Sequence, residues 1–418
     1  MKYTSMKKTP ISHADEWLKG MESTIRNNGD IVATIQSFSF NGSATITKNW
    51  EGIPYLYNEF WTARQRQGHS IHEISYRACF KPQLPSFFID LLTDPGDSVY
   101  DPFMGRGTTP IQAAIMGRRS VGSDANPLSA LLVRPRLSAP KIDEVSHRLR
   151  EIDWTFTESV RDDLLVFYHI DTLRQIHALR RYITERIQTG QFDRVDDWIR
   201  MVAINRLTGH SPGFFSVYTL PPNQAVSIDA QAKINFKRGQ VPEARSVSAI
   251  IHKKTRTLLS DASFVTIDPL LYVCPSHSTP QIATGSIDLV VTSPPFLDIV
   301  QYAQDNWLRC WFAGLEVAQD SIAMYRKVED WCAFINATFL ELARTVRSGG
   351  YIAFEVGEVR KGKIELDKHV IEAIKDLPFN PIAVIVNVQE FTKTANCWGV
   401  SNNSSGTNTN RIVLCQRK

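Results

Sequence analysis

The sequence lacks closely spaced cysteines: its six cysteines are scattered over 418 residues, and none forms a CxxC pair. This scarcity excludes a zinc ribbon and a dense disulfide framework, and it indicates free buried thiols in a reducing compartment. No apolar run approaches the ~20 residues that cross a bilayer. The basic N-terminus, MKYTSMKKTPISHADEW, has no apolar segment of the kind found in secretory signals. We therefore expect a soluble cytoplasmic protein with no membrane partner.

The sequence also lacks a marked excess of charge, because 47 basic and 43 acidic residues leave a formal net charge of +4. Hydrophobic residues make up 43% and charged residues 22%, which are ordinary values for a globular protein and exclude a disordered or fibrous chain. A chain of 418 residues is longer than one hydrophobic core usually supports. One large domain with an insertion, or two domains, is expected.

A strand–turn–helix–strand pattern begins near residue 98. SVYDPF (98–103) is typical of a buried strand, TTPIQAAIMG (108–117) of a helix, and SVGSDANP (120–127) of a second strand. Such a βαβ unit implies a parallel sheet that is covered on both faces. Further strands are predicted over residues 269–273, 287–296, 349–358, 380–391 and 410–417.

Between these strands the pattern becomes mostly helical. Asp171 is a suitable N-cap for a helix over 171–187, and a second helix is expected over 195–209. The predicted fold is α/β, with a mainly parallel, doubly wound sheet and a largely helical insertion. The expected parts are residues 1–68, of unclear role; 69–140, the first part of the α/β domain; 141–267, the insertion; and 268–418, the second part. Within residues 1–68, the segments 30–40 and 43–50 could be strands and 58–67 a helix.

Two features suggest a nucleotide-like ligand at a strand end. The segment Asp101–Thr109 (DPFMGRGTT) places glycines where a backbone can turn sharply and approach a ligand. Asp124 ends the next strand, at a spacing from which a carboxylate can accept both ribose hydroxyl hydrogens. A tight turn that binds nothing and a solvated turn aspartate are the alternatives. No Gly-Lys-Ser/Thr follows, so a Walker phosphate loop is excluded. Together the two features favour an adenosine-containing cofactor.

The sharpest feature is IDLVVTSPPF (287–296), a buried strand that ends in a hydroxyl residue, two prolines and an aromatic residue. Prolines donate no backbone hydrogen bond and make the loop stiff. The Ser293 hydroxyl and a carbonyl can then accept the hydrogens of a planar amino-bearing ring, on which Phe296 stacks. A proline-rich turn that merely closes the strand is the alternative.

In these segments the sequence resembles the DNA amino-methyltransferases, which methylate an exocyclic nitrogen of cytosine or adenine with S-adenosylmethionine. DPFMGRGTT resembles their motif I, Asp124 the acidic position of motif II, and TSPPF the catalytic motif IV in its cytosine-N4 form. HEISYRACFKP (72–82) resembles motif X, and RSGGYIAFEVGE (347–358) the later strand-forming motif. The resemblance covers residues 69–135 and 268–418, in an order similar to the alpha-type arrangement.

The resemblance implies a Rossmann-like methyltransferase domain that binds S-adenosylmethionine and methylates N4 of a cytosine flipped out of double-stranded DNA. The implied catalytic residues are Ser293, Pro294, Pro295 and Phe296. The implied cofactor-binding residues are Phe80, Lys81, Asp101, Phe103, Gly105, Gly107, Thr108, Asp124 and Asn126. No metal is expected, because no His/Cys cluster has ligand spacing. A cognate restriction endonuclease is a possible partner, and association with the nucleoid through DNA is implied.

The sequence departs from the family pattern at two places. Arg106 stands where the family often has serine, and it could face the cofactor carboxylate or solvent. The segment before motif IV, LYVCPSHS, has no carboxylate, so Ser276 or backbone groups are the expected substitutes. An adenine-N6 enzyme, an RNA amino-methyltransferase and a non-catalytic DNA-binding protein remain alternatives.

The insertion is where the family places target recognition. Residues 231–260 contain seven basic residues and one acidic residue, Glu243, which suits a loop facing phosphate; a solvated surface is the alternative. The loop 210–227 is rich in proline and glycine, and the helices could merely brace the catalytic domain. The expected DNA contacts are Asn223, Gln224, Lys237, Arg238, Lys253 and Lys254.

Overall fold

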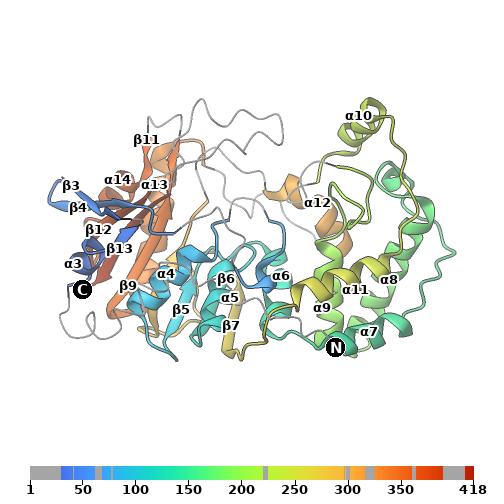
Figure 1. Ribbon diagram of the computed structural model, residues 1–418, viewed down its shortest axis with the longest axis horizontal. Helices are drawn as coiled ribbons and strands as arrows, with labels where there is room; N and C mark the ends of the chain where they lie inside the picture. Colours follow the sequence, from blue (N-terminus) through green and yellow to red (C-terminus); the bar gives the residue numbers. More distant parts are fainter. Residues whose placement is uncertain are drawn as a thin grey trace.

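The computed structural model describes residues 30–40, 42–61, 68–76, 79–219, 225–295, 297, 302–315, 325–359, 364–388 and 410–418 (Figure 1). A sheet dominates one side of the molecule and a group of helices the other (Figure 1). Among the described residues, no helix is long and apolar enough to cross a membrane. The five described cysteines are all free thiols.

The central sheet has nine strands in the order β3-β4-β12-β13-β9-β8-β5-β6-β7. In that order they span Ile46–Trp50, Ile53–Asn58, Phe379–Asn387, Asn410–Arg417, Val346–Val356, Ile287–Thr292, Ser98–Asp101, Arg119–Asp124 and Ile267–Val273. The run from β9 through β8, β5 and β6 to β7 is parallel, whereas β13 is antiparallel to both neighbours. Strand β4 pairs in parallel with β12, so residues near the N-terminus extend the sheet. Two short hairpins lie apart from it: β1 (Ser39–Phe40) with β2 (Ser43–Ala44), and β10 (Glu358–Val359) with β11 (Ile364–Glu365).

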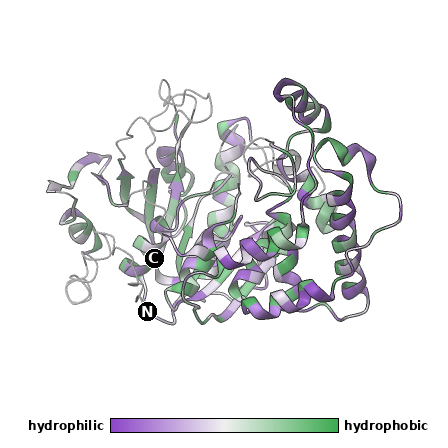
Figure 2. Cartoon of the chain, turned by 45° about the vertical axis from the view of Figure 1, so that its right-hand side comes forward, coloured by the Kyte–Doolittle hydropathy of each residue, from purple (hydrophilic) through white to green (hydrophobic). Residues whose placement is uncertain are grey.

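Both faces of the sheet are covered, as the apolar runs of its strands predict. On β8, Leu289 and Val291 pack in the core beside helix α4 (Gln83–Leu92), and Val290 packs in the opposite core beside helix α13 (Val328–Thr345). This alternation follows from the two-residue period of a strand. Helices α3 (Ile31–Gln36) and α5 (Thr108–Ile115) contribute to the first face and α14 (Leu366–Ala373) to the second. Figure 2 shows hydrophobic residues along the strands of the sheet. The predicted doubly wound, mainly parallel sheet is confirmed.

The helices of the other part pack around a further core, which includes the fully buried Trp198. Its elements are α6 (Pro127–Leu137), α7 (Ile142–Glu151), the 3-10 helix η2 (Asp162–Val166), α8 (Ile170–Gln188), α9 (Arg194–Ile204), α10 (Ile228–Arg238) and α11 (Val247–Leu258). Helix α12 (Tyr302–Ala313), which follows β8 in the chain, joins this core through Leu308 and Phe312. The 3-10 helix η1 (Ser70–His72) lies against α11.

Three local expectations are wrong. Residues 31–36 form a helix, because the Asp30 carboxylate caps it by accepting from the Ala33 amide at 3.0 Å. The N-cap of α8 is His169 rather than Asp171. The basic stretch 231–260 is mainly two helices, α10 and α11, instead of a loop. The strands predicted within 43–50 are confirmed, whereas most of the helix predicted over 58–67 lies outside the described residues.

Candidate active site

The sheet order changes direction between β5 and β8. From β5 the chain builds outward through β6 and β7, and from β8 it builds the other way through β9. The carboxyl ends of two such strands leave a crevice in which ligands of open α/β sheets bind. Asp101 ends β5 and Ser293 follows β8, so the two segments that the sequence singles out meet at this crevice.

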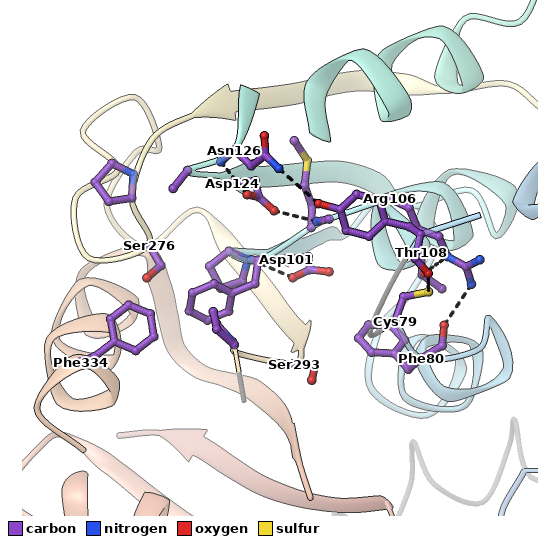
Figure 3. Close-up of a pocket in the computed structure, with 18 of the residues that line it drawn as sticks. Cys79, Phe80, Asp101, Arg106, Thr108, Asp124, Asn126, Ser276, Ser293 and Phe334 are labelled. Atoms are coloured by element: carbon purple, nitrogen blue, oxygen red, sulfur yellow. Dashed lines mark hydrogen bonds between the residues drawn. The ribbon is translucent and has the colours of Figure 1, made fainter. Parts of the chain in front are cut away.

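A cavity of about 270 Å³ occupies this place (Figure 3). The predicted residues that line it are Phe80, Asp101, Phe103, Gly105, Thr108, Asp124, Asn126, Ser293 and Pro295. Figure 3 shows Asp124 and Asn126 on one side, Ser293 on the opposite side, and Asp101 between them. The glycine turn after β5 and the end of β8 therefore share one pocket.

The turn after β5 is held to the end of β6 by Asp124. One carboxylate oxygen accepts the Gly105 amide at 2.8 Å, and the other accepts the Asn126 amide at 2.8 Å. Burial raises the pKa of Asp124, and these two backbone donors oppose the rise. Because each carboxylate oxygen has two acceptor positions, the bonds leave acceptor capacity for a ligand.

The glycines of the turn have different roles. Gly105 lines the pocket, whereas Gly107 does not. Gly107 has a φ angle of +78°, and an added Cβ would lie only 2.4 Å from a Val133 methyl carbon. Gly107 thus permits the left-handed turn and the close packing of the helix behind it. Lys81 is exposed and does not line the pocket either.

Arg106 lines the pocket and also holds a neighbouring segment of the chain in place. Its guanidinium donates to the Ile74 carbonyl at 2.9 Å and to the Phe80 carbonyl at 3.3 Å. The Arg106 carbonyl in turn accepts from the buried Arg136. Arg106 therefore ties the 74–80 segment to the glycine turn, and this brings Tyr76 and Phe80 to the pocket wall.

Two buried carboxyl groups flank the end of β8. Asp101, on β5, accepts a hydrogen bond from the Thr292 hydroxyl at 2.6 Å, and burial raises its pKa to about 7. Glu355 lies on β9, where Phe354 is in register with Thr292. Burial raises the pKa of the Glu355 carboxyl to about 7, and the nearby Ser293 hydroxyl opposes the rise. A second contact comes from the Asn410 side-chain amide at 2.8 Å.

The sequence interpretation missed several residues of this site. Glu355 could have been noticed as an acid within the apolar strand YIAFEV. Aromatic residues Phe334 and Tyr325 line the pocket, with ring centroids 5.0 Å apart, and Phe103 lies 5.6 Å from Phe334. No local pattern distinguishes these aromatic residues from ordinary core residues, because helix α13 brings Phe334 in from a distant part of the chain.

The remaining predicted residues are placed as follows. Ser276 lines the pocket, and its hydroxyl lies 2.9 Å from that of Thr338. Pro294 is buried in the chain segment that holds Ser293 and does not line the pocket. Phe296, Asn223 and Gln224 lie outside the described residues. No group of three or more His, Cys, Asp or Glu side chains in the described part of the chain is placed to hold a metal ion.

The expected DNA contacts lie on the helical part. Lys237 and Arg238 are exposed in the last turn of α10, with the Arg238 guanidinium 3.8 Å from the centre of the Tyr218 ring. Lys253 is exposed on α11. Lys254 is different, because its ammonium is mostly buried and lies 3.5 Å from the Glu73 carboxylate.

Comparison with known proteins points to one family. A family model described as DNA methylase matches residues 8–130, which include β5, the glycine turn and β6. Type II methyltransferase M.BsoBI of Geobacillus stearothermophilus is 22% identical over 71% of this chain and 62% of its own length. Type II methyltransferase M.MjaII of Methanocaldococcus jannaschii is 33% identical over 25% of this chain and 20% of its own length. These matches support the DNA methylase family for this chain.

The DNA methylase match ends before β8, so it includes the Asp124 side of the pocket and not the Ser293 side. The chain spans less than two thirds of the length of the curated relatives. Among solved structures, TrmN from Thermus thermophilus overlaps 84% of this chain and 52% of its own, with 10% identity and a TM-score of 0.33. That likeness is too low to bear on activity.

Proposed function

We propose that this chain is a DNA methyltransferase that uses S-adenosylmethionine to methylate N4 of a cytosine flipped out of the double helix. The main support is that one pocket brings together the Asp101–Thr108 turn, Asp124 and the Ser293–Pro295 segment. A donor and an acceptor of a methyl group bound at the two sides would meet in the middle. The match to the DNA methylase family and the type II methyltransferase relatives agree with this reading.

The residues of the pocket fit S-adenosylmethionine. Asp124 has acceptor capacity left for ribose hydroxyls, and Phe103, Phe334 and Tyr325 offer apolar faces to an adenine ring. Phe80 and Thr108 lie on the side where the methionine part would extend (Figure 3). When bound, S-adenosylmethionine supplies a methyl group made electrophilic by its positively charged sulfur.

On the opposite side, the proposed target is an exocyclic amino group. Its nitrogen lone pair is delocalised into the ring, so the amine is a weak nucleophile. The Ser293 hydroxyl and the Pro294 carbonyl would accept its two hydrogens and draw the nitrogen toward tetrahedral geometry. Stacking of the base on Phe296 remains a proposal from the sequence, since that residue lies outside the described part of the chain.

Glu355 extends this arrangement. Methylation leaves a positive charge on the amino nitrogen, whose proton must then depart. The Ser293 hydroxyl can take this proton while it passes its own to the nearby Glu355 carboxylate. Both groups return to their starting states once Glu355 loses the proton to water.

Cytosine is favoured over adenine because position 293 is serine, where adenine-N6 enzymes usually have aspartate or asparagine. The segment after β7 supports the same choice, since Pro275, Ser276 and His277 line the pocket without a carboxylate. Adenine-N6 methylation is the second candidate, and the family match does not separate the two. The insertion 141–267 is the proposed target-recognition region.

Transfer of a labelled methyl group tests this function. The wild-type chain is incubated with labelled S-adenosylmethionine and either double-stranded DNA or RNA, and Ser293→Ala serves as the matched inactive variant. We expect label in DNA with the wild type, little with Ser293→Ala, and equal cofactor affinity of both by calorimetry. Label that enters RNA alone would contradict the DNA assignment.

A further inference from the structure

Three cationic side chains from different helices meet where the insertion adjoins the pocket domain. Arg206 follows α9, Lys254 lies on α11, and Arg309 lies on α12. Arg206 and Arg309 are 9% and 5% exposed, and the Lys254 side chain is 12% exposed. We call these three residues the cation cluster. Long basic side chains are seldom so buried unless they are paired.

Among the described residues, two carboxylates lie near the cation cluster. Lys254 faces Glu73, whose side chain is 52% exposed, and Asp305 is the nearby acid that favours the charge of Arg309. Burial lowers the pKa of Lys254 to about 8, with a further contribution from Arg206. The pKa values of Arg206 and Arg309 both fall to about 10, chiefly through burial. Lowered pKa values at all three positions mean that the surroundings disfavour the positive charges.

Arg200, a buried arginine on α9, differs from Arg206 in its partners. Arg200 donates to the Asp197 carboxylate at 2.5 Å, and Asp197 also accepts from Arg134 at 2.7 Å. In the part of the chain that the structure describes, no carboxylate forms an ion pair with Arg206, although Glu73 favours its charge from farther away. Its Nε atom donates to the Asn205 carbonyl at 2.8 Å, and its terminal nitrogens have no hydrogen-bond partner among the described residues.

The Arg206 guanidinium is nevertheless held in place. Its central carbon lies 4.0 Å from the centre of the Phe214 ring. A guanidinium stacked on a ring keeps its outer N–H groups available in a fixed plane, which matches two oxygens of one phosphate. Lys254 and Arg309 add positive charge without needing the same fork geometry.

The cation cluster is linked to the pocket through the 73–76 segment. Arg309 donates to the Ser75 carbonyl at 3.0 Å and Lys254 faces Glu73, while Tyr76 of the same segment lines the pocket. Helix α12 follows Ser293 closely in the chain and contacts α9, on the side of the insertion that faces the sheet (Figure 1). An anion bound here would therefore lie between the pocket and the basic helices.

We propose that the cation cluster binds one backbone phosphate of the DNA, with Arg206 as the principal contact. This inference rests on the proposed function, because it assumes that DNA enters the cleft. A phosphate contact positions the DNA and reads no sequence. It would fix the strand close to the nucleotide that enters the pocket.

The experiment compares DNA binding by the full chain and Arg206→Gln at several salt concentrations, using fluorescence anisotropy of a labelled duplex. Loss of one phosphate contact should reduce the slope of log affinity against log salt by about 0.9. If the two proteins bind equally at 1 M salt, this difference in slope makes the variant bind about eightfold more weakly than the wild type at 0.1 M salt, whatever the duplex sequence. Arg206→Lys should retain most of the slope, because it keeps the charge.

Lys375→Gln is the matched control, since Lys375 is an exposed cation that follows α14 and pairs with Glu372. It should bind DNA as the wild type does. Unchanged cofactor affinity and melting temperature verify the fold of Arg206→Gln; if it does not fold, Lys254→Gln is measured in the same way. If folded Arg206→Gln has the wild-type salt slope, the proposed phosphate site is wrong, while the proposed function is unaffected. Failure of the wild-type chain to bind DNA would instead overturn the proposed function.

Discussion

At the scale of single residues, the unusual feature is the pair of buried acids beside β8. Asp101 accepts a hydrogen bond from Thr292, and Glu355 lies near the Ser293 hydroxyl, so each acid is close to a hydroxyl of the segment that enters the pocket. Burial holds both pKa values near 7. Groups whose pKa values lie near the working pH can both take up and release protons, which favours a role in chemistry over one in stability.

Glu355→Gln tests the proton path. Below about pH 7 the Glu355 carboxyl is protonated and cannot take a further proton, so wild-type turnover should rise as the pH increases through about 7. The variant should turn over roughly 100-fold more slowly and lose that rise, with unchanged cofactor affinity. Single-turnover rates between pH 5.5 and 8.5 measure this, and Glu355→Asp should recover part of the activity. A Glu355→Gln profile with the wild-type rise would remove Glu355 from the mechanism.

Asp124→Asn tests the cofactor side. The variant keeps an oxygen acceptor for one backbone amide but loses the charge and one acceptor, so ribose hydroxyls would be held less well. We expect cofactor affinity to fall at least about tenfold, as for loss of a hydrogen bond to a charged group. Calorimetry measures the affinity, and circular dichroism verifies the fold. Wild-type cofactor affinity in a folded variant would show that Asp124 only stabilises the turn and does not contact the cofactor.

At the scale of elements, the strands were predictable and the boundaries of several helices were not. The strands after residue 98 are apolar runs bounded by turn residues, and each appears near its expected place. The basic stretch was misassigned because charge dominated its interpretation, although its capping residues are ordinary. Ser227 caps α10 through the Ala230 amide at 3.2 Å, Gly239 ends it in a left-handed conformation, and Ser246 caps α11.

Placing the basic residues on helices sharpens the DNA prediction. Lys237, Arg238 and Lys253 are exposed, so their replacement by alanine should spare the core. If all three contact phosphates, the triple variant should bind every duplex more weakly, with a salt slope smaller by about 2 to 3. Anisotropy titrations measure this, with Lys375→Gln as the control. An unchanged slope would move DNA contact away from α10 and α11.

At the scale of the whole molecule, the sequence predicts the sheet and one ligand crevice, because both follow from strand order and turn chemistry. The residues that form the walls of the pocket are harder to predict from the sequence, because they come from separated parts of the chain. Tyr76 is brought in by Arg106 and Phe334 by helix α13, while the register of β9 beside β8 places Glu355 near Ser293, behind the wall. The pairing of β4 with β12 likewise depends on contacts between distant residues.

The central claim is that the protein methylates a cytosine amino group of DNA in the pocket shared by Asp124 and Ser293. The direct measurement is to react the wild-type chain with S-adenosylmethionine and duplex DNA, digest the DNA to nucleosides, and identify the methylated nucleoside by mass and fragmentation. We expect N4-methylcytosine, absent when Ser293→Ala replaces the wild type. N6-methyladenine would contradict the cytosine assignment, and no methylated nucleoside from any duplex, by a chain that binds both cofactor and DNA, would contradict the claim itself.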